Sequence, residues 1–417
     1  MAKHSVEQGG AGKQALGVGG IDVAKDWHSV QWLDVNGRPV GKAFRFAHTR
    51  AGFESMWARR PSDAVRIGME STGHYWLGLA HWLRAHGAEV VWVQPAHVHR
   101  LKELDDNTPT KTDAKEARVI ARLVYDGRWF RWAPRAGALA QLATLAVTRR
   151  HHHQEVMRWR SRIVGWIHQY FPEFLSVFKA WDGKAALTVL DTQPTPDWVL
   201  AQSVDALTDQ FKAATKNRVG AKRAHALHQG AVDSIGIPEG RATARLQLAS
   251  YLRSWRAAHA AQTAMEAEQA AILADFAPAQ PLFGIPGFGP QVIATLLGEL
   301  GDLSRFADPR QAQKMAGLNL TQISSGHHQG QTHIAKRGRP AARAVLYQAA
   351  CIAVAKDTQW KAWYQSLTRR MAHPLAPKAA MVATATQLLR VAWACMKHGQ
   401  AYDARHLFST AEVIDAA

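Results

Sequence analysis

The sequence has very little cysteine, since only Cys351 and Cys395 occur among its 417 residues. Two cysteines are too few for the disulfide framework of a small secreted domain, and too few for a zinc site built on cysteine. Both lie in stretches rich in alanine and valine. Such stretches predict buried helix, so we expect two unreactive thiols in the protein core.

Long apolar runs are missing as well. A membrane-spanning helix needs roughly 18 or more consecutive apolar residues, and the apolar stretch at 375–396 carries Lys378 and Arg390. The first twenty residues are rich in glycine and lack the apolar core of a signal peptide. We therefore expect a cytoplasmic protein with no membrane partner.

Acidic residues are the minority charge. The chain has 51 Lys and Arg against 33 Asp and Glu, which gives a formal net charge of +18. Such an excess predicts attraction to polyanions, to nucleic acid first and to anionic membrane second. At roughly 100–200 residues per domain, the length predicts two or three domains.

The first 125 residues show an alternation of strand and helix signals. Asn36-Gly37 is a strong hairpin signal between two apolar segments. We expect strands at 16–24, 29–35, 39–46, 64–70 and 89–94, and helices at 49–60, 76–86 and 112–125. Three antiparallel strands followed by strand–helix alternation predict a mixed sheet with helices on its faces.

The rest of the chain is predicted to be helical. Apolar residues at spacings of three and four occur at 142–170 and 248–276, which predicts long helices that pack as a coiled coil. Further helices are expected at 292–300, 309–316, 340–355 and 377–397. The predicted organisation is a flexible N-terminus at 1–15, an α/β domain at 16–137, a helical coiled-coil region at 138–277, a mainly helical domain at 278–400 and a tail at 401–417.

Four carboxylates stand out because acids are scarce. Asp22 and Glu70 each end an apolar strand, and Asp113 and Glu116 are three residues apart, which places them on one face of a helix. Taken singly, each is most simply a helix cap or a solvated charge. Taken together, they fit phosphodiester chemistry, in which carboxylates hold divalent cations that clamp the attacking and leaving oxygens.

Three motifs carry a resemblance to a known family. Gly20-Ile-Asp22-Val-Ala-Lys25, Met69-Glu70-Ser-Thr-Gly73 and Lys111-Thr-Asp113-Ala-Lys-Glu116-Ala117 resemble the DEDD transposases of the insertion-sequence-110 family. The resemblance implies an N-terminal domain that is RuvC-like, of the RNase H type. It implies that Asp22, Glu70, Asp113 and Glu116 bind Mg²⁺ or Mn²⁺. The family normally has Asp at the fourth position, so Glu116 is a departure.

A second resemblance lies near the C-terminus. The segment Gly317-Leu-Asn-Leu-Thr-Gln-Ile-Ser-Ser325-Gly326, followed by Ile334-Ala-Lys-Arg-Gly338, is similar to the C-terminal transposase domain of the same family. From the residues alone, Ser-Ser-Gly is an ordinary turn. The resemblance implies that Ser325, with Ser324 as the adjacent rival, is a nucleophile that forms a covalent phosphoserine–DNA intermediate.

Two basic clusters are candidate nucleic-acid contacts, although a solvated helix surface explains the first equally well. Their members are Lys212, Lys216, Arg218, Lys222, Arg223, Lys336, Arg337, Arg339 and Arg343. The resemblance implies DNA as substrate, a structured guide RNA encoded by the element, and a bacterial, nucleoid-associated location. The helical seams and the need to bring two DNA sites together predict a homodimer or homotetramer.

The leading hypothesis is therefore a DNA recombinase that cuts and rejoins strands to move its own insertion sequence. A second hypothesis is a structure-specific endonuclease of the RuvC type, which would use the four carboxylates and metal-activated water without a covalent intermediate. A third is a nucleic-acid-binding protein without catalytic activity, for which Glu116 is the sequence support.

Overall fold

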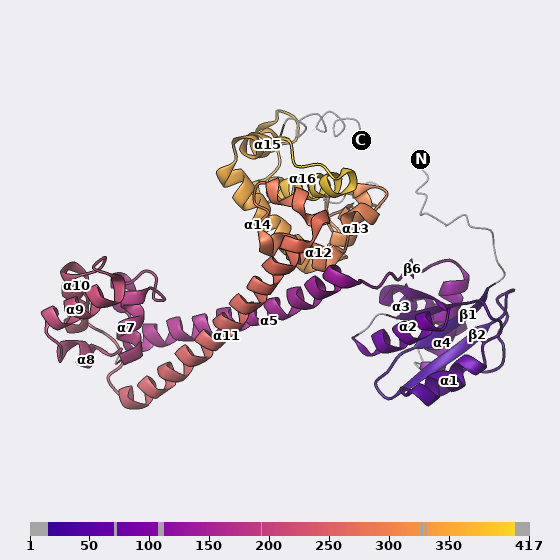
Figure 1. Ribbon diagram of the computed structural model, residues 1–417, viewed down its shortest axis with the longest axis horizontal. Coiled ribbons are helices and arrows are strands. Elements are labelled where there is room, and N and C mark those ends of the chain that lie inside the picture. The colour runs from indigo at the N-terminus through magenta and orange to yellow at the C-terminus, as the bar shows by residue number, and fades with distance from the viewer. Residues whose placement is uncertain are drawn as a thin grey trace. The chain divides into compact units, whose positions relative to one another are not determined.

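The computed structural model describes residues 16–70, 73–106, 112–192, 194–322, 324–325, 328–329 and 332–404. The chain divides into two compact units, Met1–Pro134 and Arg135–Ala417, whose elements are labelled in Figure 1. The predicted flexible N-terminus at 1–15 lies outside the described residues, as does most of the predicted tail at 401–417.

Unit 1 is built on a six-stranded sheet with the strand order β3-β2-β1-β4-β5-β6. Strands β3, β2 and β1 are antiparallel neighbours, whereas β1, β4 and β5 are parallel. The predicted mixed sheet is confirmed. The strands are β1 Gly17–Asp22, β2 Trp27–Leu33, β3 Phe44–Ala47, β4 Val65–Glu70, β5 Glu89–Val93 and β6 Phe130–Arg131.

Helices cover both faces of this sheet. On one face, Ile21 and Met69 are fully buried against Phe53 and Leu79 from α1 and α2. On the other face, Val18 and several valines of β5 pack against α3 and α4. The helices of unit 1 are α1 Arg50–Ala58, α2 Tyr75–Ala85, α3 Pro95–Asp106 and α4 Asp113–Tyr125.

Two glycines allow α4 to lie directly on the sheet. A Cβ atom added to Gly20 of β1 would lie 2.1 Å from Ala121 N and 2.4 Å from Ala117 O. A Cβ added to Gly68 of β4 would lie 2.2 Å from Val124 Cγ2. Real Cβ atoms do not approach backbone atoms this closely, because the interior is already close-packed. The absence of side chains at these two positions therefore fixes how near α4 comes to β1 and β4.

Unit 2 contains two long helices that lie side by side, α5 Gly137–Tyr170 and α11 Arg241–Asp275 (Figure 1). Their facing residues are buried, among them Ile163 and Trp166 on α5 and Leu248 and Leu252 on α11. The indole Nε1 of Trp166 donates to Ala244 O at 2.8 Å, which joins the two helices. The predicted long helices are confirmed, while the coiled coil itself stays a prediction.

Short helices between α5 and α11 form a lobe with its own core. Trp181, Val189, Phe211 and Leu227 are buried there in one cluster with the ends of the two long helices. From the sequence, this part of the chain was distinguished only by its basic residues at 212–223, so this core was not predicted. The lobe helices are α6 Phe174–Val177, α7 Lys184–Thr192, α8 Pro196–Leu200, α9 Val204–Thr215 and α10 Ala221–Val232.

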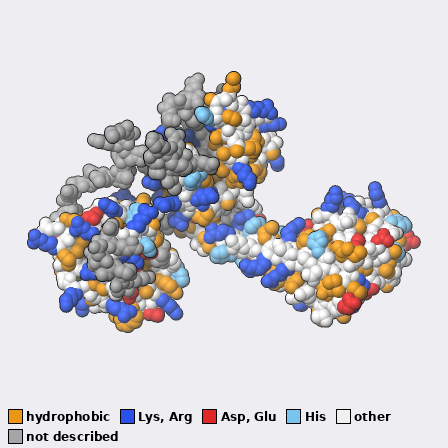
Figure 2. Space-filling view, turned by 180° about the vertical axis from the view of Figure 1, so that it is seen from behind, with side chains coloured by type: hydrophobic (Ala, Val, Ile, Leu, Met, Phe, Trp, Pro, Cys, Tyr) orange, Lys and Arg blue, Asp and Glu red, His pale blue; other side chains and the backbone are white. Residues whose placement is uncertain are grey.

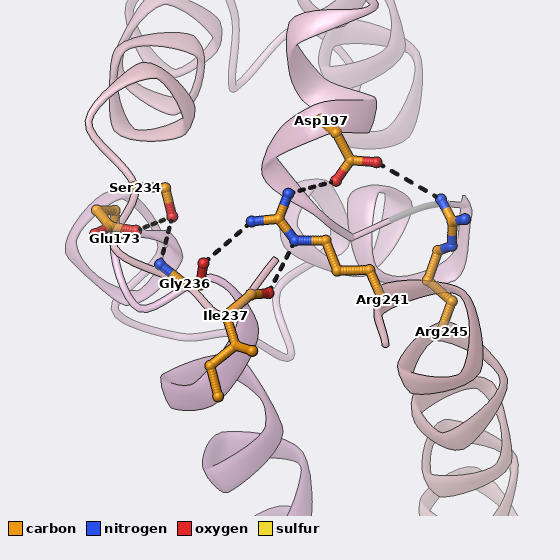
Figure 3. Close-up of polar contacts among 7 residues, drawn as sticks. All are labelled: Glu173, Asp197, Ser234, Gly236, Ile237, Arg241 and Arg245. Carbon is orange, nitrogen blue, oxygen red and sulfur yellow. Dashed lines mark hydrogen bonds and ion pairs between the residues drawn. The ribbon is translucent and has the colours of Figure 1, made fainter. Parts of the chain in front are cut away.

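Polar contacts hold the turn between α10 and α11 (Figure 3). The Glu173 carboxylate accepts hydrogen bonds from Ser234 Oγ at 2.7 Å and from Ile235 N at 3.0 Å. Arg241, the first residue of α11, donates to Asp197 Oδ1 of α8 at 3.0 Å. The turn is therefore anchored at both of its sides.

The C-terminal part of unit 2 is a helical cluster around α12, every residue of which from Val292 to Leu300 is buried. Helix α16 is long and apolar enough to cross a membrane by composition, and half of its apolar window is buried inside unit 2, where Leu388 and Leu389 join the core. Core packing therefore accounts for its hydropathy. The elements are η1 Ala277–Gly284, α12 Pro290–Leu300, η2 Leu303–Arg305, α13 Pro309–Ala316, β7 Leu320–Thr321, β8 Ser324–Ser325, β9 His328–Gln329, β10 His333–Ile334, α14 Pro340–Lys356, α15 Thr358–Arg369 and α16 Pro377–His398.

The prediction that both cysteines are buried is half wrong. Cys395 is buried, but Cys351 is exposed. Helix α14 buries Leu346, Ala349, Ala350 and Ala353, and Cys351 lies on the opposite face. An Ala-rich composition did not reveal which face of the helix is solvated.

The contact between Gly20 and α4 leads to a stability prediction. Gly20→Ala should lower the free energy of unfolding by about 3 kcal/mol, because the added methyl group displaces the backbone of α4. Gly78→Ala is the control, since Gly78 lies in helix α2 with open space around it, and alanine there should stabilise by roughly 0.5–1 kcal/mol. Chemical denaturation measures both values. Equal effects of the two substitutions would contradict the packing argument.

Candidate active site and nucleic-acid interface

Two of the predicted carboxylates lie side by side at the carboxyl ends of parallel strands. Ile21 of β1 is in register with Met69 of β4, so Asp22 and Glu70 are the next residues on adjacent strands. Side chains two residues apart in a strand share a face, so Asp22 and Glu70 lie on the face of Gly20 and Gly68, which α4 covers. Both are half-buried.

The first turn of α4 supplies the third carboxylate. Thr112 caps the helix, its Oγ1 accepting a hydrogen bond from Lys115 N at 3.2 Å. Asp113, the first helical residue, is exposed. Placing a negative charge there is favourable, because the N-terminus of a helix carries partial positive charge.

A hollow of about 330 Å³ lies between this turn and the strands β2 and β3. Ser29 of β2 lines it, and Ser29 is the cross-strand partner of Asp22. The N-terminal end of α4 is therefore at the same end of the sheet as Asp22. The other lining residues are Ala43, Phe44, Arg45, Thr112, Asp113 and Ala114.

Glu116 lies in a different environment from Asp113. It is buried, and its Oε1 forms an ion pair with Lys102 Nζ of α3. The side chain of Lys102 is 17% exposed and that of Glu116 is 11% exposed. The carboxylate at the position where the sequence departs from the family pattern thus contributes to the packing of α3 on α4.

The donors at this end of the sheet suit a hard divalent cation, because all of them are carboxylate oxygens. Asp22 and Glu70 come from neighbouring strands and Asp113 from the helix that lies on them. In the part of the chain that the structure describes, no three His, Cys, Asp or Glu residues are gathered closely enough to hold an ion. The structure places the strands and the helix that carry the carboxylates at one end of the sheet, but the carboxylates themselves do not form a closed set of metal ligands.

Sequence reasoning missed three residues around this site. Arg45 lines the hollow with Asp113, Lys102 pairs with Glu116, and His28 precedes Ser29 on β2. The pairing of Ser29 with both Asp22 and Arg45 was available from the predicted hairpins. Lys102 had no comparable signal, because its helix is predominantly polar.

His28 holds the loop that follows Asp22. Its Nδ1 accepts a hydrogen bond from Ala24 N at 3.3 Å, and its Nε2 lies 2.7 Å from His48 Nδ1. A ring that accepts at Nδ1 must carry its proton at Nε2, so His28 donates to His48. Burial, and secondly the nearby His48, lower the pKa of His28 to about 4.

The predicted nucleophile lies in a short hairpin of unit 2. Ser324 and Ser325 form β8, which pairs antiparallel with β9, with Ser325 opposite His328. This hairpin interrupts the ribbon made by β7 and β10, in which Thr321 is opposite His333. The four carboxylates and Ser325 therefore belong to separate units of the chain.

The predicted basic contacts divide into solvated residues and residues with structural partners. Arg223 donates to Val177 O, and Arg343 Nη1 donates to Ala316 O at 2.9 Å. Both guanidinium groups therefore help to hold the fold. The remaining seven are exposed: Lys212, Lys216, Arg218, Lys222, Lys336, Arg337 and Arg339. Figure 2 shows blue Lys and Arg side chains widely distributed over this face, with fewer red Asp and Glu side chains.

Two family models match the chain in order. The first, described as a transposase and built on the DEDD transposases of the IS110 type, matches residues 19–172. The second, the transposase IS116/IS110/IS902 family, matches residues 279–365. Together the two regions include Asp22, Glu70, Asp113, Glu116 and Ser325.

Curated relatives are similar over different lengths. The pilin gene-inverting protein of Moraxella lacunata is 28% identical over 149 residues, which are 34% of this chain and 45% of that protein. The chain thus covers less than half of that relative. The 44.8 kDa protein of insertion element IS116 from Streptomyces clavuligerus is 24% identical over 91% of this chain and 94% of its own length. The 43.6 kDa protein of IS110 from Streptomyces coelicolor is 24% identical over 93% and 95%.

The buried ion pair between Lys102 and Glu116 leads to a stability prediction. Lys102→Met should lower the free energy of unfolding by roughly 3 kcal/mol, because it removes a positive partner from a buried carboxylate. Adding Glu116→Gln should recover a large part of that loss. Arg50→Met is the control, since the Arg50–Glu54 pair is exposed and such pairs contribute roughly 0.5 kcal/mol. A loss no larger than that of the control would contradict a buried pair.

The lowered pKa of His28 leads to a pH prediction. Between pH 6.5 and about 4, the unfolded chain binds a proton at His28 that the folded chain does not. The contribution of His28 to the free energy of unfolding is therefore fully present above pH 6.5. It falls as the pH drops towards 4, by at most about 1.4 kcal/mol per pH unit. His28→Gln should flatten the curve of melting temperature against pH in this window. An unchanged slope would contradict a buried neutral His28.

Proposed function

Since this chain belongs to the IS116/IS110/IS902 family of transposases, we propose that it cuts and rejoins DNA strands to mobilise an insertion sequence. The observation that carries the proposal is the register of β1 and β4. It places Asp22 beside Glu70 on the face covered by α4. The first turn of that helix presents Asp113 at the same end of the sheet.

We propose that unit 1 is an RNase H-like domain of the RuvC type and that Mg²⁺ or Mn²⁺ is its cofactor. Asp22, Glu70 and Asp113 would hold the ion, with Glu116 as the fourth carboxylate of the family pattern. A divalent cation bound there supplies positive charge to the oxygens of a phosphodiester. The ion pair with Lys102 would compete with a cation for the carboxylate of Glu116.

Ser325 is the proposed nucleophile. Its hydroxyl oxygen forms a bond to phosphorus, the bond between phosphorus and one deoxyribose oxygen breaks, and that oxygen leaves with the serine proton. The resulting phosphoserine conserves the phosphodiester bond, so the hydroxyl group of another strand can displace Ser325 and restore a continuous strand. The carboxylate site and the serine site would act together as one composite centre.

Partners follow from the same proposal. DNA of the element and of the target is the substrate, and a structured non-coding RNA directs the choice of site. The net charge of +18 and the exposed basic residues of α9, α10 and the segment before α14 support two nucleic-acid partners. We propose a homodimer or homotetramer, because strand exchange brings two DNA sites together, and a bacterial cytoplasmic, nucleoid-associated location.

The name of one relative, the pilin gene-inverting protein, agrees with this activity. A protein that inverts a pilin gene must cut and rejoin DNA at two places. Inversion and transposition share the same strand chemistry and differ in the arrangement of the sites. The similarity between this chain and that protein therefore supports recombination over simple cleavage.

The alternative is a RuvC-like endonuclease that hydrolyses DNA without a covalent intermediate, and Ser325 separates the two. Ser325→Ala should abolish both strand rejoining and the protein–DNA adduct seen on a denaturing gel, because no other group forms the phosphoserine. Ser324→Ala is the matched control and should retain both. Asp22→Ala should abolish cleavage in the presence of Mg²⁺.

Three results would contradict the recombinase. If Ser325→Ala cuts and rejoins DNA as well as the wild type, the serine mechanism fails. If the wild type and Ser325→Ala both cut DNA and neither rejoins it or forms an adduct, the endonuclease is favoured. If the wild type shows no cleavage of the element ends with Mg²⁺ and the guide RNA present, the protein only binds nucleic acid.

A further inference from the structure

Three arginines of unit 2 gather at the C-terminal end of α12. Arg135 Nη2 donates to Glu299 O at 2.7 Å, and Arg305 Nη2 donates to Leu300 O at 3.0 Å. These two carbonyl groups belong to consecutive residues at the end of one helix. The two guanidinium groups are therefore neighbours, although 170 residues separate them in the sequence.

The third arginine is linked to this pair through Met315 of α13. Arg339 N donates to Met315 O at 2.9 Å, and Arg305 Nη2 lies 3.4 Å from Met315 Sδ. Arg339 is the N-cap residue of α14 and is exposed, and Arg305 is exposed as well. The cluster is thus open to solvent on at least one side.

Nearby carboxylates do not balance these charges. Glu299 Oε1 is paired with Arg150 Nη1 at 3.2 Å, and Asp302 Oδ1 accepts a hydrogen bond from Ser304 N at 2.8 Å. In the described part of the chain, the Arg339 guanidinium has no ion pair with a carboxylate. The three guanidinium groups therefore lie near enough to affect one another's pKa, and the carboxylates beside them, Glu299 and Asp302, offset their charge only in part.

Burial first, and repulsion between the guanidinium groups second, disfavour the charged form of these arginines. Burial lowers the pKa of Arg135, and the charges of Arg339 and Arg305 lower it further, against the opposing effect of Glu299. Burial also lowers the pKa of Arg305, where Asp302 raises it and Arg339 lowers it. Since the cluster is open to solvent, a bound anion would offset both the burial cost and the repulsion of these guanidinium groups.

We propose that Arg135, Arg305 and Arg339 form a phosphate site that binds the backbone of the nucleic acid next to Ser325. The planar guanidinium fork matches a phosphate group in geometry and charge. Arg339 follows strand β10, and the hairpin that contains Ser325 is inserted between β7 and β10. The identification of the phosphate as that of a DNA strand rests on the proposed function.

Arg135 connects the arginine site to the start of unit 2. Arg135 is the first residue of unit 2 and directly follows unit 1. Its hydrogen bond to Glu299 O fixes this junction to the end of α12. A phosphate bound by Arg135 would therefore be held at the start of unit 2 and beside the segment that leads into α14.

Thermal unfolding of the full-length chain tests the anion site without DNA. Inorganic phosphate should raise the melting temperature of the wild type by more than chloride at equal ionic strength. Arg305→Gln and Arg339→Gln should abolish this gain, and Arg339→Gln should raise the melting temperature of the free protein, because repulsion is relieved. Arg310→Gln, an exposed arginine of α13, is the control and should keep the phosphate effect.

DNA binding measured against salt concentration tests the ligand. With a duplex that carries the element end, each of Arg305→Gln and Arg339→Gln should reduce the slope of log affinity against log salt by about 1. The control Arg310→Gln should leave the slope unchanged. Arg135→Gln is the least informative variant, because its side chain also holds α12, so the conclusion rests on Arg305 and Arg339.

The outcomes separate this proposal from the proposed function. If phosphate stabilises the wild type, the control and both cluster variants equally, an adventitious ion only is bound and the arginine site is overturned. If phosphate stabilises through the arginines but the chain binds no DNA, the anion site stands and the recombinase fails. If DNA binds with the same salt slope in all variants, the cluster does not contact the backbone and the proposal is overturned.

Discussion

The close contact between α4 and two glycines of the sheet is the constraint on which unit 1 depends. With no side chain at Gly20 or Gly68, the backbone of α4 lies directly on β1 and β4. The same strands end at Asp22 and Glu70, and the same helix begins at Asp113. One packing contact therefore determines that three carboxylates from distant parts of the sequence occupy one end of the sheet.

In unit 2, the fold gathers arginines instead of carboxylates. Its helical core around α12 presents consecutive carbonyl groups at the helix end, and these orient Arg135 and Arg305. Positive groups near a helix C-terminus are favourable because the carbonyl groups there carry partial negative charge. The excess positive charge of the chain thus includes an ordered part, built into the fold, and a solvated part on α9 and α10. Ordered arginines suit a protein that positions a phosphodiester, and solvated basic residues suit a protein that holds long nucleic acids.

Much of unit 1 was predictable because its signals are local. The Asn36-Gly37 turn, the apolar strands and the carboxylates at their ends required no long-range information. In unit 2, the predicted helices at 309–316, 340–355 and 377–397 also match α13, α14 and α16 closely. Helix α3 was not predicted because it is polar, so Lys102, the partner of Glu116, was not predicted either. The core of the lobe was missed because Trp181 comes from a turn and Val189 and Phe211 come from two separate short helices, so the three show no common period. The arginine cluster depends on contacts between residues 135, 305 and 339, which no spacing reveals.

The most direct test of the central claim is to measure Mn²⁺ binding by the full-length chain with isothermal titration calorimetry. The account predicts that the wild type binds Mn²⁺ and that Asp22→Asn, Glu70→Gln and Asp113→Asn each weaken binding by roughly tenfold or more. Asp63→Asn, which changes a fully exposed carboxylate of the same unit, should bind as the wild type does. Equal binding by all these proteins, or no binding by the wild type, would contradict a metal site at the ends of β1 and β4.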